Sequence, residues 1–163
     1  MTAASGSGGE QPLEFLKIER DADFPSWAPR SQIERFFHET MKPYHDSLED
    51  VKAALDYALV PGKGQGGFLM LCHRAERLLG ALAMLETGMK GYVPEHILLF
   101  VSIDPEARGQ GVGRKLIERS LEECPGDVKL HVEHDNPAKR LYERMGFTSK
   151  YAEMRLKKKR TEE

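Results

Sequence analysis

Apolar and polar residues follow two different periods along this chain, and each change of period marks a new element. Residues 13–19 alternate between apolar and polar types and predict a first strand. Apolar residues at helical spacing predict a helix over 31–41, with Ser31 as its N-cap and Glu34 as the capping-box partner. A second helix is expected over 47–59, because a Pro-Gly pair follows it.

The remainder of the chain predicts strands at 68–73, 78–85, 97–103, 128–133 and 150–157, and helices at about 112–124 and 136–145. The first two of these strands form a hairpin, and the helix after the third makes a crossover between strands. The order is therefore strand, two helices, three strands, helix, strand, helix and a last strand. This order indicates an α/β (α+β) fold with a single mixed, mostly antiparallel, twisted sheet and helices on both faces.

The length of 163 residues suits one domain with a core of its own. Residues 1–11 are rich in Gly, Ser and Ala and predict a disordered leader. No linker divides residues 12–158, which we expect to form a single domain, and 159–163 form a charged tail.

The net charge of −2 provides no general field for a polyanion, so we expect neither a nucleic-acid nor a membrane partner. No apolar run approaches the roughly 18 residues of a membrane span. The two cysteines, Cys72 and Cys124, lie in apolar stretches without C-x-x-C spacing, which favours a reducing, cytoplasmic location.

The most informative motif lies between the strand at 97–103 and the following helix, where glycines alternate with cations and other residues. Glycines allow close approach of the backbone to a ligand, and the N-terminus of a helix attracts anions. The motif lacks both the third glycine of a dinucleotide fingerprint and the Gly-Lys-Ser/Thr of a Walker loop. It therefore predicts a phosphate or pyrophosphate site made by Arg108, Gly109, Gln110, Gly111, Val112, Gly113, Arg114 and Lys115.

The pattern R-x-x-G-x-G, here Arg108, Gly111 and Gly113, resembles the acetyl-CoA pyrophosphate loop of the GNAT superfamily of N-acetyltransferases. Residues 136–147 resemble the second recognisable segment of that family, which ends in Leu-Tyr-x-x-x-Gly-Phe. The resemblance implies an acyl-CoA N-acyltransferase-like fold and acetyl-CoA as cosubstrate, with no metal. It also implies transfer of acetyl to a primary amine by direct attack in a ternary complex. A non-catalytic acyl-CoA-binding sensor or regulatory module is the alternative.

The resemblance also assigns roles to single residues. Tyr142 occupies the position of the general acid, and a phenol can protonate a thiolate leaving group. The family's base corresponds to Glu95, thirteen residues before Arg108, and we expect partial desolvation to raise its pKa. His96 is the rival base, because histidine titrates near neutral pH. Neighbouring residues project to opposite faces of the sheet, so we expect only one of the two to point at the acceptor. Asn136 is the candidate for a cofactor contact, although the family's asparagine lies one position earlier, where this chain has Asp135.

The thioester carbonyl would lie against Val101 and its neighbours, with Ile103 further along the same strand. Strand N–H groups that are free of pairing there could stabilise an oxyanion. A splay between the fourth and fifth strands, which would admit the pantetheine arm, is implied by the family.

Two further clusters carry weaker signals. The run from His131 to His134 lacks H-E-x-x-H spacing, so no zinc site is expected. Tyr44, His45 and Asp46 either contact the acceptor or form a turn. The acceptor itself is expected to be a small-molecule or peptide amine, and a homodimer is among the expected assemblies.

Overall fold

The computed structural model describes residues 11–43 and 46–160, so most of the expected leader lies outside the described residues. The described residues separate into two compact units, which divide between His131 and Val132. The single domain expected over 12–158 stays a prediction.

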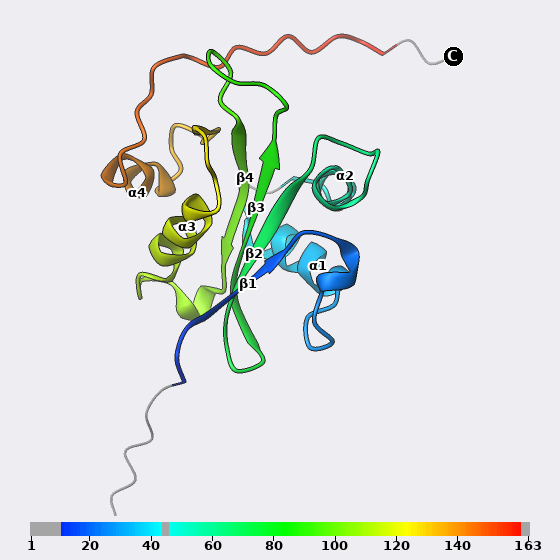
Figure 1. The fold of residues 1–163 in the computed structure, drawn as a ribbon. Helices are drawn as coiled ribbons and strands as arrows, with labels where there is room; N and C mark the ends of the chain where they lie inside the picture. Colours follow the sequence, from blue (N-terminus) through cyan, green and yellow to red (C-terminus); the bar gives the residue numbers. More distant parts are fainter. Residues whose placement is uncertain (1–10, 44–45, 161–163) are drawn as a thin grey trace, which may run out of the picture. The chain divides into compact units, whose positions relative to one another are not determined.

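The first unit contains one five-stranded sheet in the order β1-β2-β3-β4-β5 (Figure 1). The first four strands pair antiparallel, whereas β5 runs parallel to β4. The predicted mixed, mostly antiparallel sheet is thus confirmed. Its strands are β1 (Glu14–Ile18), β2 (Gly67–Arg74), β3 (Arg77–Glu86), β4 (His96–Ile103) and β5 (Val128–Leu130).

Helices cover both faces of this sheet, as predicted (Figure 1). On one face lie α1 (Arg30–Thr40) and α2 (Leu48–Leu59), and on the other lies α3 (Val112–Glu122). Short 3-10 turns, η1 (Asp21–Asp23) and η2 (Pro105–Ala107), precede α1 and α3. The second unit contains α4 (Ala138–Arg144).

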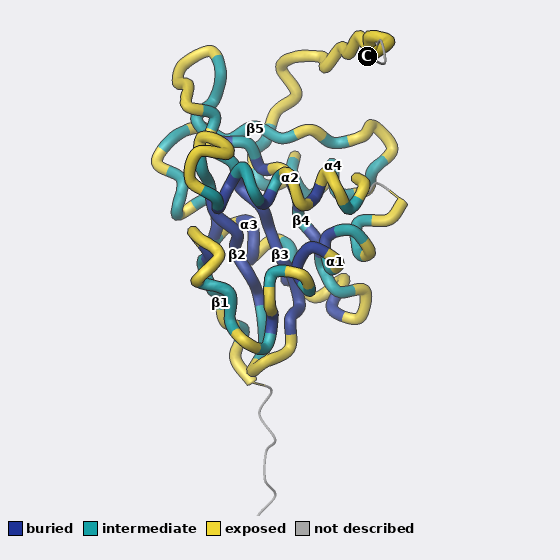
Figure 2. The backbone as a smooth tube through the Cα atoms, turned by 90° about the vertical axis from the view of Figure 1, so that its right-hand side faces the viewer, coloured by how far each residue is buried: buried dark blue, intermediate teal, exposed yellow. Residues whose placement is uncertain are grey.

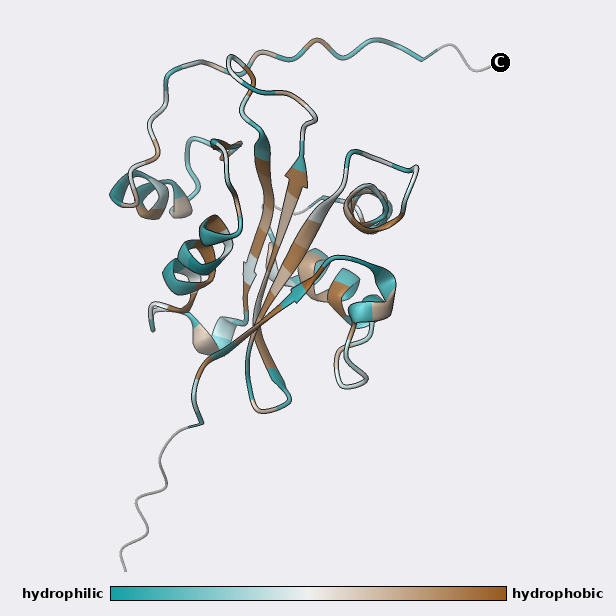
Figure 3. Cartoon of the chain, viewed as in Figure 1, coloured by the Kyte–Doolittle hydropathy of each residue, from teal (hydrophilic) through white to brown (hydrophobic). Residues whose placement is uncertain are grey.

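Consecutive residues along β2 and β3 are buried and mostly apolar (Figures 2 and 3). Because neighbouring side chains project to opposite faces of a strand, both faces of these central strands contribute to the core. Ala81 and Ala83 belong to the cluster that α1 and α2 complete, where the rings of Phe37 and Phe100 are 5.4 Å apart. Gly80 points to the other face, and a Cβ there would lie 3.1 Å from Leu116 of α3. The glycine therefore allows α3 to approach the sheet closely.

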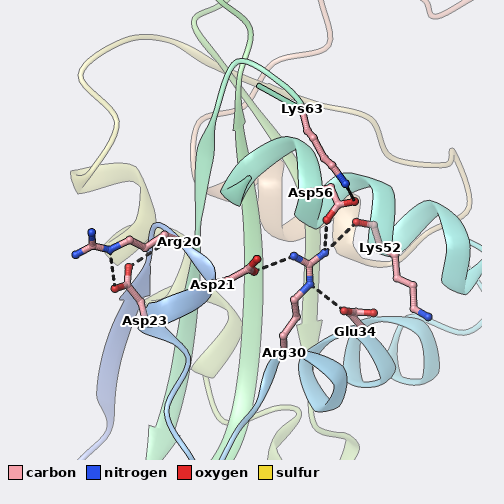
Figure 4. Close-up of polar contacts among 8 residues, drawn as sticks. All are labelled: Arg20, Asp21, Asp23, Arg30, Glu34, Lys52, Asp56 and Lys63. Atoms are coloured by element: carbon pink, nitrogen blue, oxygen red, sulfur yellow. Dashed lines mark hydrogen bonds and ion pairs between the residues drawn. The ribbon is translucent and has the colours of Figure 1, made fainter. Parts of the chain in front are cut away.

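Arg30, the first residue of α1, connects the segments on one face of the sheet (Figure 4). Burial alone would lower the pKa of Arg30, but hydrogen bonds to three carboxylates raise it above its ordinary value. The Arg30 guanidinium donates to Asp21 Oδ1 at 2.8 Å, Glu34 Oε1 at 3.0 Å, Asp56 Oδ1 at 2.7 Å and the Lys52 carbonyl at 3.3 Å. This charged cluster joins η1, α1 and α2.

The predicted cap of the first helix is wrong. Pro29 occupies the N-cap of α1, and Glu34 pairs with Arg30 instead of closing a capping box with Ser31. Ser47 caps the second helix, because its Oγ accepts from the Asp50 N–H at 3.1 Å.

The strand predicted at 150–157 is also wrong for the described chain, where residues 152–160 have no regular structure. The fifth strand likewise ends at Leu130 instead of 133. An alternating pattern is not sufficient for a strand, since its backbone groups need a neighbouring strand as partner.

Candidate active site

The glycine motif forms the connection from η2 to α3. Gly109 and Gly111 both have φ near +76°, and Gly111 is the N-cap of α3 in the left-handed conformation. A Cβ at either glycine would meet no atom within 4 Å, so the backbone conformation is what favours glycine here. The open space beside these glycines leaves room for a ligand at the start of the helix.

The first turn of α3 presents amide hydrogens to that space. Its first backbone hydrogen bond runs from Lys115 N to the Gly111 carbonyl at 3.2 Å. Among the described residues, the amides of Val112, Gly113 and Arg114 have no acceptor. Unpaired amides and the helix dipole together make an anion site. The phosphate-binding role expected of this turn stays a prediction, for which these amides are the available donors.

The side chains of the motif are mostly occupied within the protein. Arg108 Nη2 donates to the Thr40 carbonyl at 2.9 Å, at the end of α1. Gln110 Nε2 donates to the Glu106 carbonyl at 3.3 Å, and Arg114 pairs with Glu118 at 2.8 Å. Lys115 is exposed and forms no hydrogen bond or ion pair within the described part of the chain. Lys115 is thus the motif's cation best placed to meet a ligand.

Strand β4 contains an irregularity that sequence reasoning missed. Ala83 pairs with Phe100 while Met84 pairs with Leu98, so Leu99 is an extra residue opposite β3. Such a bulge leaves backbone groups unpaired and redirects side chains. No sequence signal marks Leu99, because it is one apolar residue within a continuous apolar run.

The pairing of β4 with β5 ends at the same place. It covers His96 to Leu98 on β4, and β5 itself stops at Leu130. Beyond this point, within the described residues, β4 has no strand on its β5 side. Val101 and Ile103 lie on this stretch, in register with Leu82 and Gly80 on β3. The pairing with β5 thus ends just before the bulge, and the splay that the family implies stays a prediction.

Glu95 behaves differently from expectation. Its Oε2 accepts from the Asp127 N–H at 2.8 Å, and Gly126 lies so close that a Cβ there would meet the carboxylate at 2.6 Å. Hydrogen bonds from its own amide and from Asp127 hold the pKa of Glu95 below its ordinary value. The expected upward shift is wrong, because these backbone amides stabilise the carboxylate form.

His96, the rival base, is only 6% exposed. Its backbone N–H donates to the Asp127 carbonyl at 3.0 Å, and it lies in register with Glu86 on β3. Neither ring nitrogen has a hydrogen-bond partner among the described residues. A buried imidazole without partners is costly, which makes His96 a candidate for contact with a water or a ligand.

The second unit contains the other two predicted site residues. Asn136 Oδ1 accepts from the N–H of Ala138, the first residue of α4, at 2.9 Å, while Pro137 is the N-cap. The half-buried Tyr142 ring lies edge-on to Phe147, with centroids 5.8 Å apart. Burial raises the pKa of the Tyr142 hydroxyl, which keeps it in the protonated form that an acid requires.

Tyr44 and His45 lie outside the described residues. Within the described ranges, no group of three or more His, Cys, Asp and Glu side chains could hold a metal ion. Burial raises the pKa of the Cys72 and Cys124 thiols to about 11, which disfavours a cysteine nucleophile. No helix in 11–43 or 46–160 is long and apolar enough to cross a bilayer.

A family model described as an acetyltransferase (GNAT) domain matches residues 64–149. The chain belongs to the GNAT acetyltransferase family. The match contains the glycine motif and α4, the two segments that carry the resemblance in the sequence.

Similar proteins with known names or solved structures include acetyltransferases. A mycothiol acetyltransferase from Actinosynnema mirum is 38% identical over 90 residues, which are 50% of this chain and 28% of that protein. This GNAT chain thus matches little more than a quarter of that relative's length. A possible acetyltransferase from Clostridium difficile 630 has a TM-score of 0.65 at 15% identity, over 91% of this chain and 99% of that one. An aminoglycoside N-acetyltransferase solved with CoA gives 0.62 at 13% identity, over 93% and 97%. The two solved structures share the fold.

Proposed function

We propose that this GNAT chain is an acetyl-CoA-dependent N-acetyltransferase that acetylates a primary amine by direct attack in a ternary complex. The observation that carries the proposal is the unpaired first turn of α3 beside the open stretch of β4. The family membership and the fold shared with a CoA-bound acetyltransferase support the choice of cosubstrate.

The cofactor would be held mainly by backbone groups. The amides between Gly109 and Arg114 would bind the pyrophosphate, and Lys115 would add charge. Arg108 and Gln110 would shape the turn through their contacts with α1 and η2. The thioester would lie along β4 from the bulge to Val101 and Ile103, where unpaired backbone groups could stabilise the oxyanion.

In the proposed step, the amine nitrogen forms a bond to the thioester carbon and the carbon–sulfur bond breaks. The thiolate takes its proton from Tyr142, and the amine gives its proton to a base at the start of β4. Glu95 remains the base that the family implies, whereas His96 has the unpartnered ring. Asn136 is a further candidate for a cofactor contact beside its hydrogen bond to the Ala138 amide.

The first test is thermal unfolding with acetyl-CoA against an equal concentration of ADP. A ligand at a hundred times its Kd adds about 2.7 kcal/mol, which raises the Tm of a domain of this size by roughly 5–11 °C. A shift with acetyl-CoA well beyond that with ADP would support the cosubstrate. No shift with either would overturn the proposal.

Thiol release with a panel of amines then separates enzyme from sensor. A Tyr142→Phe variant should keep the acetyl-CoA shift and lose at least about tenfold in kcat if the hydroxyl is the acid. A normal shift with no thiol release for any amine would favour the alternative, a non-catalytic acyl-CoA-binding module. The engaged carboxylate of Glu95 is the observation that favours this alternative.

A further inference from the structure

Glu95 connects three segments of the first unit through hydrogen bonds of its backbone and its side chain. Its carbonyl accepts from the N–H of Thr87, directly after β3, at 2.9 Å. Its Oε2 accepts from the N–H of Asp127, directly before β5, at 2.8 Å. Glu95 itself comes directly before β4, so one residue joins the ends of three neighbouring strands.

The bond from Asp127 to the carboxylate is one of a pair. The Asp127 carbonyl accepts from the His96 N–H at 3.0 Å, so both backbone groups of Asp127 are bound by two consecutive residues. A charged acceptor at this distance makes a stronger hydrogen bond than a neutral one. The carboxylate thus adds one bond at the start of the pairing between β4 and β5.

This pairing is short. It covers three residues on each strand, His96 to Leu98 on β4 and Val128 to Leu130 on β5. Parallel pairing is slightly less stable per residue than antiparallel pairing, and within the described chain β5 has no strand on its other side. The position of β5 therefore depends on how its first residues are held.

Gly126 leaves room for the carboxylate. A Cβ at Gly126 would lie 2.6 Å from Cδ and 2.7 Å from Oε2 of Glu95. Gly126 is not among the glycines with positive φ, so the close approach of Glu95, and not the backbone conformation, favours glycine here. A side chain at this position would displace the carboxylate without any change to Glu95 itself.

The same contacts place Glu95 badly for proton transfer. It lies four residues before the bulge at Leu99, where the proposed thioester site begins, and four residues of strand span about 13 Å. A base must lie within about 3 Å of the group that gives the proton, directly or through one water. Hydrogen bonds from backbone amides also hold the pKa of Glu95 below its ordinary value, which weakens it as a base near neutral pH.

We propose that Glu95 is a positioning residue for acetyl transfer, whose carboxylate fixes the start of β5 against β4, and that it is not the base. This inference rests on the proposed acetyltransferase function. Glu95 acts through the backbone of Asp127. By fixing where β5 begins, it fixes which stretch of β4 stays unpaired for the thioester. Its loss should therefore lower kcat and leave cofactor binding at the start of α3 unchanged.

Variants at two positions distinguish positioning from proton transfer in the thiol-release assay, with 2-phenylethylamine, spermidine and Nα-acetyl-lysine amide as acceptors. Glu95→Gln keeps a neutral acceptor oxygen for the Asp127 N–H, so its kcat should stay within a few fold of the wild type, with the same pH profile. Glu95→Ala and Gly126→Ala should each lower kcat about tenfold through misplacement of β4 against β5, with the acetyl-CoA thermal shift retained. The double variant Glu95→Ala/Gly126→Ala should be no worse than Glu95→Ala, because no carboxylate remains to be displaced.

Glu86→Gln is the matched control. Glu86 lies directly opposite His96 on β3, and its carboxylate forms no hydrogen bond or ion pair within the described part of the chain. The variant removes a nearby charge without removing a contact. It should therefore keep the kcat and the pH profile of the wild type.

The hydrogen bond itself is tested in solution by the amide resonance of Asp127. This resonance should shift as Glu95 ionises in the acid range. The shift should be absent in Glu95→Gln and reduced in Gly126→Ala. An Asp127 amide that does not follow the ionisation of Glu95 overturns the inference.

The kinetic outcomes separate the inference from the proposed function. A loss of at least about a hundredfold in kcat for Glu95→Gln, with the acid limb of the pH profile removed, identifies a base and overturns the inference. Additive losses in the double variant, or a wild-type kcat in Glu95→Ala, overturn it as well. An acetyl-CoA shift that is absent, or thiol release by the wild type that is absent with every amine, refutes the proposed function itself.

Discussion

Replacement of Arg30 by methionine tests how much the charged cluster of Figure 4 stabilises the face of the sheet covered by α1 and α2. The side chain of Arg30 is 22% exposed and that of its partner Glu34 is 10% exposed. Removal of one member of a buried pair leaves the other charge uncompensated and costs about 3–5 kcal/mol. Asp21 and Asp56 are more exposed than Glu34, so their ion pairs with Arg30 contribute little to the free energy of unfolding.

Because about a fifth of Arg30 is open to solvent, we expect Arg30→Met to reduce the free energy of unfolding by about 2–3 kcal/mol. In a chain of this size, that corresponds to a Tm lower by roughly 4–12 °C. Urea unfolding at pH 7, followed by circular dichroism, measures the difference directly. The double variant Arg30→Met/Glu34→Leu should recover part of the loss, since it removes the stranded carboxylate as well.

Arg20→Met is the matched control, because Arg20 forms an ion pair with Asp23 while its own side chain is 77% exposed. Its effect on stability should be much smaller than that of Arg30→Met. Equal losses for the two variants would show that burial does not decide the strength of these pairs. No recovery in the double variant would show that a stranded Glu34 is not the source of the loss.

Three further predictions concern single positions. Gly111→Ala should lower the free energy of unfolding by about 1–2 kcal/mol, because the left-handed backbone at this position disfavours a side chain. It should also reduce the thermal shift with acetyl-CoA, and an unchanged shift would contradict the proposed site. Glu95→Gln should destabilise the protein above pH 4.5 and not at acid pH. A carboxylate with a depressed pKa contributes stability above the pKa of the unfolded state, and this stability is lost as the pH falls through the pKa of the folded state. Urea unfolding from pH 3 to 7 measures this difference. Phe37→Ala should cost about 3–5 kcal/mol in urea unfolding, and a loss below about 1 kcal/mol would contradict its place in the core beside Phe100.

Local chemistry is what the sequence by itself determined. Alternation located the first strand, continuous apolar runs located the next three, and helical spacing located the helices, all to within a few residues. Ser47 and Asn136 bind amides only two or three residues away, so their roles could be predicted from the local sequence. The glycine turn before α3 was equally readable, since its left-handed backbone requires glycine at fixed positions.

Contacts between distant segments were decided only by the tertiary structure. Arg108, expected beside a ligand, donates to Thr40, and Glu95, expected to be a base, binds the Asp127 amide. The extra residue at Leu99 depends on how β4 fits β3, and no local pattern encodes that register. Residues 150–157 carry the alternation of a strand, yet pair with none in the described chain. A side chain's partner and a strand's neighbour both come from elsewhere in the chain, so periodicity can indicate which residues are buried but not what they meet.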